Sequence, residues 1–230
     1  YSLCSITILS YFFSIEGFLS ISISVMGEYG VIGSEYRTEI DSFSKVTQLG
    51  GGLNSSSTYF KVERKDGTVV FYGRDTQSRI TPDGAPATLS WLVSSEYDRT
   101  KVQNSIFYEY SSFNSGEVRI ANIYYTGDAQ SHGDRRVEFN YEERPDYASS
   151  YLAGGLTVQS QRIENISTYY KDTKIKEYRF DYIQSRASKR SLLDRVTECG
   201  FEDAKTVCLP ATTFGWLHDE PNFELETLGY

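Results

Sequence analysis

The chain contains two histidines, His132 and His218, which are its candidates for the general base of a nucleophilic triad. His132 lies in the polar run SHGD, and His218 lies in the run LHDE near the end of the sequence. Histidines in such polar loops are usually ordinary surface residues. We therefore expect no catalytic role for either one.

Carboxylate pairs are the next candidates, because a glycosidase needs two acids that face one cleft. Glu142 and Glu143 are consecutive in an expected strand, so their side chains point to opposite faces of the sheet. Glu177 and Asp181 are four residues apart and share a face, and we interpret them as charges on the solvated side. These strands therefore give no predicted pair of catalytic acids.

Two further motifs match known sites only formally. Glu224-x-Glu226 has the spacing of the acidic pair of ADP-ribosyltransferases, but the supporting arginine and Ser-Thr-Ser elements do not precede it. Gly50–Gly52 is not followed by the Lys-Ser/Thr of a phosphate loop, and Gly154-Gly155 precedes an expected strand rather than a helix. We interpret both glycine runs as turns and expect no catalytic and no cofactor-binding residues.

Three cysteines, Cys4, Cys199 and Cys208, are too few for a disulfide scaffold and allow at most one bridge. Cys199 and Cys208 enclose GFEDAKTV between two expected strands, so a bridge that closes a hairpin is sensible if the strands pair near the cysteines. In a reducing compartment the two residues would instead remain thiols. Because both histidines are remote from these cysteines in sequence, we expect no metal site.

Composition limits the class of protein. Of the 230 residues, 39% are hydrophobic and 23% are charged, and no run of 18 or more apolar residues could form a membrane-spanning helix. The net charge of −8 argues against nucleic acid as a partner, because phosphate binding requires clustered Lys and Arg. The chain has 19 Tyr and 13 Phe beside one Met, which favours a half-buried β surface over a helix.

Alternating segments after residue 35 predict strands that are separated by turns. YFKVERKDGTVVFYG, residues 59–73, has two alternating runs around Asp66-Gly67, which favours a tight hairpin turn with positive φ angles. IFYEY at 106–110 and EVRIANIYY at 117–125 repeat this arrangement around Asn114, Ser115 and Gly116. The sequence therefore predicts an all-β chain: an antiparallel meander, a sandwich or a sheet that wraps around a larger body.

Longer alternating runs predict the rest of the sheet, with apolar residues at every second position and one solvated face. These runs are VEFNYEE (137–143), LTVQSQRIENIST (156–168), TKIKEYRFDYI (173–183), RSLLDRVTECG (190–200) and ATTFGWL (211–217). Tyr108-x-Tyr110 and the nearby Tyr124-Tyr125 suggest a tyrosine-rich array, although no exact repeat is present. The linker-like runs at 51–58 and 81–87 are short enough to be loops, so we expect no domain boundary.

The first residues differ from the rest. YSLCSITILSYFF has the apolar density of a signal-peptide core, but it lacks a positive flank and a small-residue cleavage site. ISISV at 21–25 alternates apolar and polar residues, so we prefer a strand near Ile21. Because Met26 is the only methionine, we expect the chain to be a piece of a longer protein or a processed product.

Six segments carry a family resemblance when they are taken together and in order. They are GEYGVIGSEYRTEIDSFSKV (27–46), YFKVERKDGTVVFYG (59–73), ANIYYTGD (121–128), VEFNYEERPDY (137–147), RSLLDRVTECG (190–200) and CLPATTFGW (208–216). This set resembles the SpvB-like region of bacterial toxin-complex B components and of related Rhs/YD-repeat virulence proteins. The Cys-x-Asp-Gly-like element that precedes it in such proteins is represented only by Glu16-Gly17, with Ser14 in place of Cys.

The resemblance implies a domain organisation and a structural role. Residues 27–230 would be an SpvB-like β domain from a larger protein, and residues 1–26 a divergent or non-native leading segment. In toxin-complex proteins this region belongs to a large β assembly that helps build the shell around a toxic C-terminal cargo and joins the injection apparatus. In the SpvB protein the ADP-ribosyltransferase is a separate C-terminal domain, so no catalytic residue is carried over.

We therefore expect a non-enzymatic segment of a bacterial toxin or virulence protein, without cofactor or metal, that is secreted after residence in the cytoplasm. Its expected partners are other β segments of the same protein and toxin-complex subunits, with no nucleic acid and no membrane span. The alternative from another class is a carbohydrate-binding or adhesion module, in which exposed Tyr and Trp side chains would stack on sugar rings.

Overall fold

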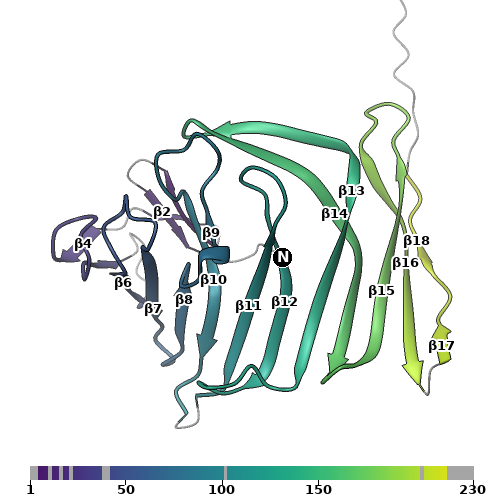
Figure 1. Cartoon of the computed structure of the whole chain (residues 1–230), viewed down its shortest axis with the longest axis horizontal. Helices are drawn as coiled ribbons and strands as arrows, with labels where there is room; N and C mark the ends of the chain where they lie inside the picture. The colour runs from purple at the N-terminus through teal and green to yellow at the C-terminus, as the bar shows by residue number, and fades with distance from the viewer. Residues whose placement is uncertain are drawn as a thin grey trace, which may run out of the picture.

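The computed structural model describes residues 5–9, 12–15, 18–20, 23–37, 42–100, 103–202 and 205–216, with side chains from residue 26 onward. Apart from one short 3₁₀ turn, η1 (Thr76–Ser78), every regular element of this part of the chain is a strand (Figure 1). The prediction of an all-β chain is therefore confirmed. The strands are β1 (Ser5–Leu9), β2 (Phe12–Ile15), β3 (Phe18–Ser20), β4 (Ile23–Met26), β5 (Glu35–Arg37), β6 (Lys45–Leu49), β7 (Tyr59–Glu63), β8 (Val69–Tyr72), β9 (Arg79–Ile80), β10 (Ser90–Tyr97), β11 (Ser105–Ser112), β12 (Val118–Gly127), β13 (Arg135–Leu152), β14 (Gly155–Tyr170), β15 (Thr173–Gln184), β16 (Ser191–Glu202), β17 (Lys205–Cys208) and β18 (Thr212–Thr213).

The main sheet is an open antiparallel meander. Strands β4 to β8 pair in chain order, β8 pairs with β10, and β10 to β16 again follow in order, so that the sheet runs from β4 to β16 (Figure 1). Both β17 and β18 pair with β16. Of the three arrangements that the sequence left open, the structure has the meander.

Strand β10 belongs to two sheets. Its first residues, Ser90–Leu92, pair with β9 and β1, whereas Ser95–Tyr97 pair with β8 and β11. An irregularity between Val93 and Ser95 separates the two halves, and such bulges bend a strand and increase its twist. This bend lets both faces of β10 contribute to a hydrophobic core.

The core lies entirely in the first half of the sheet, which we call the body (β5–β12). One cluster of buried side chains lies on one face of β10, and a second lies around Leu92 on the other. The first consists of Tyr36, Val46, Phe60, Val62, Val70, Tyr72, Trp91 and Val93; the second consists of Leu92, Tyr110 and Ile120, with Phe139 packed against it. Trp91 is completely buried, and its ring meets the edge of Phe60 at 5.1 Å between centroids.

The long strands β13–β16, which we call the wall, have almost no core of their own. After Ile120, Cys199 is the only buried hydrophobic residue in the described part of the chain. Most side chains of the wall are half-buried or exposed on both faces of the sheet. In Figure 1 these strands stand as a single curved layer beside the body.

The hairpin between β7 and β8 shows how a local signal sets the register. The backbone N–H of Gly67 donates to Arg64, and that of Arg64 donates to Thr68, so the turn spans Lys65 to Gly67. Gly67 has a φ of +88° and is the only one of these three with a positive φ, whereas the Asp66 carboxylate accepts a hydrogen bond from Thr68 N–H. The predicted hairpin is confirmed, with one positive φ angle rather than two.

Two expectations about strands change at the ends of the sheet. The strand expected near Ile21 is β4, which begins at Ile23, while residues 21 and 22 lie outside the described part. The run ATTFGWL forms only the two-residue strand β18, because Pro210 has no N–H to donate before it.

Candidate functional site

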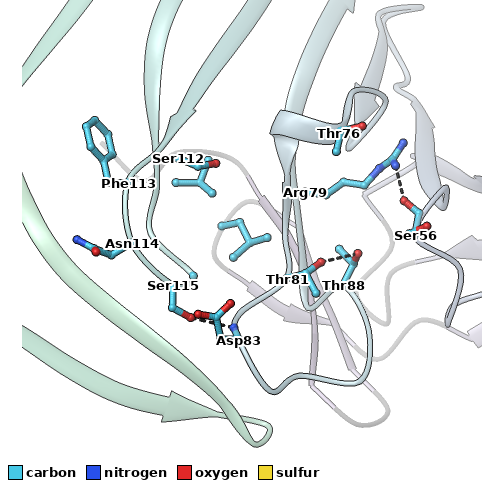
Figure 2. Close-up of a pocket in the computed structure, with 13 residues that line it drawn as sticks. Ser56, Thr76, Arg79, Thr81, Asp83, Thr88, Ser112, Phe113, Asn114 and Ser115 are labelled. Atoms are coloured by element: carbon cyan, nitrogen blue, oxygen red, sulfur yellow. Dashed lines mark hydrogen bonds between the residues drawn. The ribbon is translucent and has the colours of Figure 1, made fainter.

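A polar pocket of about 570 Å³ lies between the loop that follows β9 and the turn between β11 and β12 (Figure 2). Hydroxyl side chains dominate its lining, together with one aromatic ring, Phe113. The lining residues are Ser56, Thr76, Arg79, Ile80, Thr81, Asp83, Thr88, Ser112, Phe113, Asn114, Ser115, Gly116 and Val118. The pocket therefore contains one basic side chain, Arg79, and one carboxylate, Asp83.

Both ends of this pocket are held by structural hydrogen bonds. The Arg79 guanidinium donates to the backbone carbonyls of Gly73 (2.6 Å), Arg74 (3.1 Å) and Ser56, and burial lowers its pKa. At the other end, the Asp83 N–H donates to Ser115 Oγ at 2.8 Å. These contacts bind loops together, and one carboxylate alone cannot supply the acid pair of a glycosidase.

Glu117 is the most enclosed carboxylate in the body, with 1% of its side chain exposed. It precedes β12, and its oxygens accept hydrogen bonds from Ser160 N–H (2.8 Å), Ser160 Oγ (2.6 Å), Gln161 N–H (3.0 Å) and Arg119 (3.0 Å). Burial alone would raise the pKa of Glu117, but these donors outweigh it and the pKa is lowered. The carboxylate therefore joins the body to β14.

Asp146 makes a second junction across the wall. Strand β13 loses its pairing with β14 between Glu143 and Ala148, and within this gap Asp146 reaches β16. Its carboxylate accepts hydrogen bonds from Ser191 N–H (2.9 Å) and Ser191 Oγ (2.5 Å), and from Arg144 at 2.9 Å. The Arg144 guanidinium is the main reason that the pKa of Asp146 lies far below its usual range, with Ser191 adding to the effect.

Glu177 corrects one prediction from the sequence. We expected Glu177 and Asp181 to be solvated charges, and Asp181 is 61% exposed, but the Glu177 side chain is only 9% exposed. Glu177 forms ion pairs with Lys174 and Arg179. The pairs lower its pKa although burial opposes them, so the carboxylate is buried because both cations accompany it.

A repeated irregularity runs through the sheet. In four strands one extra residue interrupts the register against the preceding strand: Ser94 in β10, Ala121 in β12, Glu164 in β14 and Asp194 in β16. Each interruption is a β-bulge, which disrupts the local ladder of hydrogen bonds. Four times along the sheet, therefore, a carbonyl next to a bulge needs a partner other than the regular ladder.

An aromatic side chain supplies that partner in every case, and we call this contact an aromatic clamp. Tyr110 Oη donates to Val93 O (2.6 Å), Tyr141 Oη to Ile120 O (2.7 Å), Tyr182 Oη to Ile163 O (2.7 Å) and Trp216 Nε1 to Leu193 O (2.7 Å). The acceptor is always the residue immediately before the extra one. Burial raises the pKa of Tyr141 to about 12, so this phenol remains a donor at physiological pH.

Sequence reasoning missed these clamps, although a signal for them exists. Each donor ends an aromatic-x-aromatic triplet, and the four triplets are Tyr108-Glu109-Tyr110, Phe139-Asn140-Tyr141, Phe180-Asp181-Tyr182 and Phe214-Gly215-Trp216. The sequence analysis noticed only Tyr108-x-Tyr110. The intervals between triplets are unequal, and this hides the repeat from a search for a fixed period.

The remaining candidates from the sequence do not converge on one place. His132 is exposed, and its ring stacks on Phe107 and Tyr124 at 4.4 and 5.0 Å between centroids. Glu142 is paired with Arg162 at 2.7 Å. His218, Glu224, Glu226 and Cys4 lie outside the described residues.

Cys199 and Cys208 face each other across β16 and β17, with their sulfur atoms 2.05 Å apart. No group of three or more His, Cys, Asp or Glu side chains in the described ranges is arranged to hold a metal ion. The helices of the described residues include none of the length and apolarity that crossing a bilayer requires.

Comparison with known proteins gives a family and a fold. The SpvB family, described as the Salmonella virulence plasmid 65 kDa B protein, matches residues 20–192, about three quarters of the chain. A comparison with curated proteins finds no match. The N-terminal domain of effector protein SpvB from Salmonella typhimurium strain LT2 shares the fold with a TM-score of 0.69 and 14% identity, over 87% of this chain and 88% of that one.

Two toxin structures share the fold within much longer chains. The Tc holotoxin pore of Photorhabdus luminescens matches with a TM-score of 0.74 and 15% identity, over 93% of this chain. The crystal structure of TcdB2-TccC3 matches with a TM-score of 0.72 and 15% identity, over 91% of this chain. In each case the present chain spans only 14% of the toxin chain.

Proposed function

Because the chain belongs to the SpvB family, we propose that it is a non-enzymatic wall segment of a secreted bacterial toxin or virulence protein. In this role its sheet would form part of a β shell that encloses or delivers a toxic cargo. Its partners would be other β segments of the same protein and subunits of a toxin complex. Relatives that are named as effector and holotoxin proteins support this class of function.

One observation carries the proposal: the wall is a single layer of long strands with almost no apolar core. A sheet normally needs one face packed against a core for independent stability. The wall instead relies on cross-strand contacts such as Lys176–Glu198 at 2.6 Å and on the aromatic clamps. An element that exposes both faces and depends on its neighbours fits a partition within a larger structure better than a free enzyme.

The carbohydrate-binding alternative would be favoured by several Tyr or Trp side chains along one groove. The pocket of Figure 2 contributes a single aromatic ring, Phe113, and its arginine is already bonded to backbone carbonyls. An aromatic platform for a sugar ring is therefore missing from this pocket. The observations favour the structural role.

The proposal also covers the extent of the domain. We retain residue 230 as its end and a leading segment at its start. The family match begins at residue 20, and β4 pairs with β5 in the main sheet. Both observations support a domain start near residue 20 rather than at residue 27.

The proposal includes a disulfide between Cys199 and Cys208 in the secreted protein. Their positions pair directly across β16 and β17. A bridge that closes so short a loop should contribute about 2.5 kcal/mol through the entropy of the unfolded chain. Cys208→Ser should therefore lower the stability by that amount under oxidising conditions only, as measured by urea unfolding with and without reductant. Equal loss in both conditions, or a free-thiol titration that finds both cysteines reduced after secretion, would contradict the bridge.

The shell role is tested by protease protection in the parent protein. We expect the enclosed cargo segment to resist trypsin at least tenfold longer than the same segment expressed alone. Thr168→Pro should abolish this protection, because Thr168 in β14 is paired on both sides, to Val137 and Lys176, and proline cannot donate. Ala129→Pro, in an exposed turn, is the matched control and should retain it. Rapid cleavage of the cargo in the intact wild-type parent would refute the proposal.

A further inference from the structure

The aromatic clamps share a second feature, which concerns the following strand. Each aromatic residue is paired in register with a branched aliphatic residue of the next strand. The pairs are Tyr72 with Val93, Tyr110 with Ile120, Tyr141 with Ile163, and Tyr182 with Leu193. In every pair the aliphatic residue is followed by the extra residue of a bulge. The array therefore adds strands by one rule, in which an aromatic residue is matched to an aliphatic residue before a bulge.

Trp216 ends this series, and its aliphatic match is missing. It donates to Leu193 O as the tyrosines donate to their carbonyls. In the described part of the chain no strand pairs with the outer side of β17 or β18, which both pair with β16. The next position in the array is therefore open at this edge.

The edge is also unusually apolar and has free backbone groups. Val207, Leu209, Phe214 and Trp216 are 69%, 59%, 40% and 43% exposed. Phe214 N–H donates inward to Asp194 O at 2.8 Å, so by the alternation of an extended chain the N–H groups of Thr213 and Gly215 point away from β16. Exposed apolar edges of this kind invite the addition of another strand.

We propose that the edge formed by Thr212–Trp216 receives an antiparallel strand of the same parent polypeptide, which places a branched aliphatic residue before a bulge opposite Trp216. This inference rests on the proposed wall function and names its contact surface. The same polypeptide is the favoured source because the matching toxin structures contain this fold within much longer single chains. A strand of the same array also satisfies the matching rule that all four earlier positions obey.

The test uses a strand that already follows the rule. A synthetic peptide with the sequence of residues 191–202 and Cys199→Ser contains Leu193 before the bulge residue Asp194. Added to the 230-residue chain, it should slow amide hydrogen exchange at Thr213 and Gly215 at least tenfold and shift the emission of Trp216 to shorter wavelength. The matched peptide with Leu193→Asp should bind at least tenfold more weakly, because it opposes a carboxylate to the tryptophan.

Three results would overturn the inference. The first is equal binding by both peptides, and the second is unchanged exchange at Thr213 and Gly215 at saturating peptide. The third is protection of these amides by dimerisation of the chain itself, detected by light scattering without peptide, which would make a second copy the occupant. A Trp216→Phe chain, which keeps a ring, checks that the fold of the edge survives. The trypsin test of the shell does not depend on this edge, so the two proposals can fail separately.

Discussion

Replacing Glu117 with alanine should lower the free energy of unfolding by about 3 to 5 kcal/mol, the range for breaking a buried charged pair. The loss is large because every partner of this carboxylate is a donor. Without it, Ser160 N–H, Gln161 N–H and the Arg119 guanidinium all lose their acceptor in a buried place. Urea unfolding at neutral pH, followed by far-UV circular dichroism, measures the change.

Two variants separate the charge from the space that it fills. Glu117→Gln keeps the shape, but its amide presents one NH₂ group to donors, so it should lose at least half of the alanine effect. Glu143→Gln replaces an exposed carboxylate of β13 and should change stability by less than about 0.5 kcal/mol. A Glu117→Ala chain as stable as Glu143→Gln would show that the junction is dispensable.

The Glu117 effect should also depend on pH. Because its folded-state pKa is lowered below the ordinary value of 4.5, Glu117 stabilises the fold fully above that value and loses the contribution as the pH falls through the folded pKa. The difference between wild type and Glu117→Gln should therefore be largest above about pH 5.5 and shrink toward pH 3. A difference that stays constant from pH 7 to pH 3 would argue that the carboxylate is not ionised in the fold.

Junctions such as Glu117 show where sequence reasoning stops. The strands themselves could be predicted, because alternation and turn residues are local signals: Asp66-Gly67 marks a hairpin, and the long runs at 137–143 and 173–183 lie in β13 and β15. The partners of Glu117 could not be predicted. They lie more than 40 residues away and meet it only because β13 bows away from β14 between Glu143 and Ala148.

Burial of charge was equally hidden. Glu177 has the alternation of a solvated position, and nothing local indicates that Lys174 and Arg179 both fold onto it. The clamps are an intermediate case. Their triplets are visible in the sequence, but the bulges that give Tyr141 and Tyr182 their acceptors depend on the register between strands. Triplets with unequal spacing become recognisable only after that register is known.

The largest single loss of stability should come from Trp91→Ala, at about 3 to 5 kcal/mol, the range for truncating a buried aromatic residue to alanine. Trp91 is fully buried, packs on Phe60 and donates to Thr58 O at 2.6 Å. Its ring also lies where a side chain at residue 73 would be, since a Cβ on Gly73 would come within 2.1 Å of it. The body is thus built around this side chain, and a cavity there cannot be filled by small shifts.

The same variant tests whether the wall can stand without the body. The chain has two tryptophans, so in Trp91→Ala the emission comes from Trp216 alone, at the far edge of the wall. Because the wall has almost no core, its Trp216 transition in urea should move to lower concentration together with the far-UV signal of the whole sheet. Trp91→Phe, which also leaves Trp216 as the sole tryptophan but fills most of the space, is the reference and should lose far less. If Trp216 instead keeps the midpoint of the reference while the body unfolds, the wall is an independent domain, and a partition that borrows its stability from neighbouring elements is the wrong description.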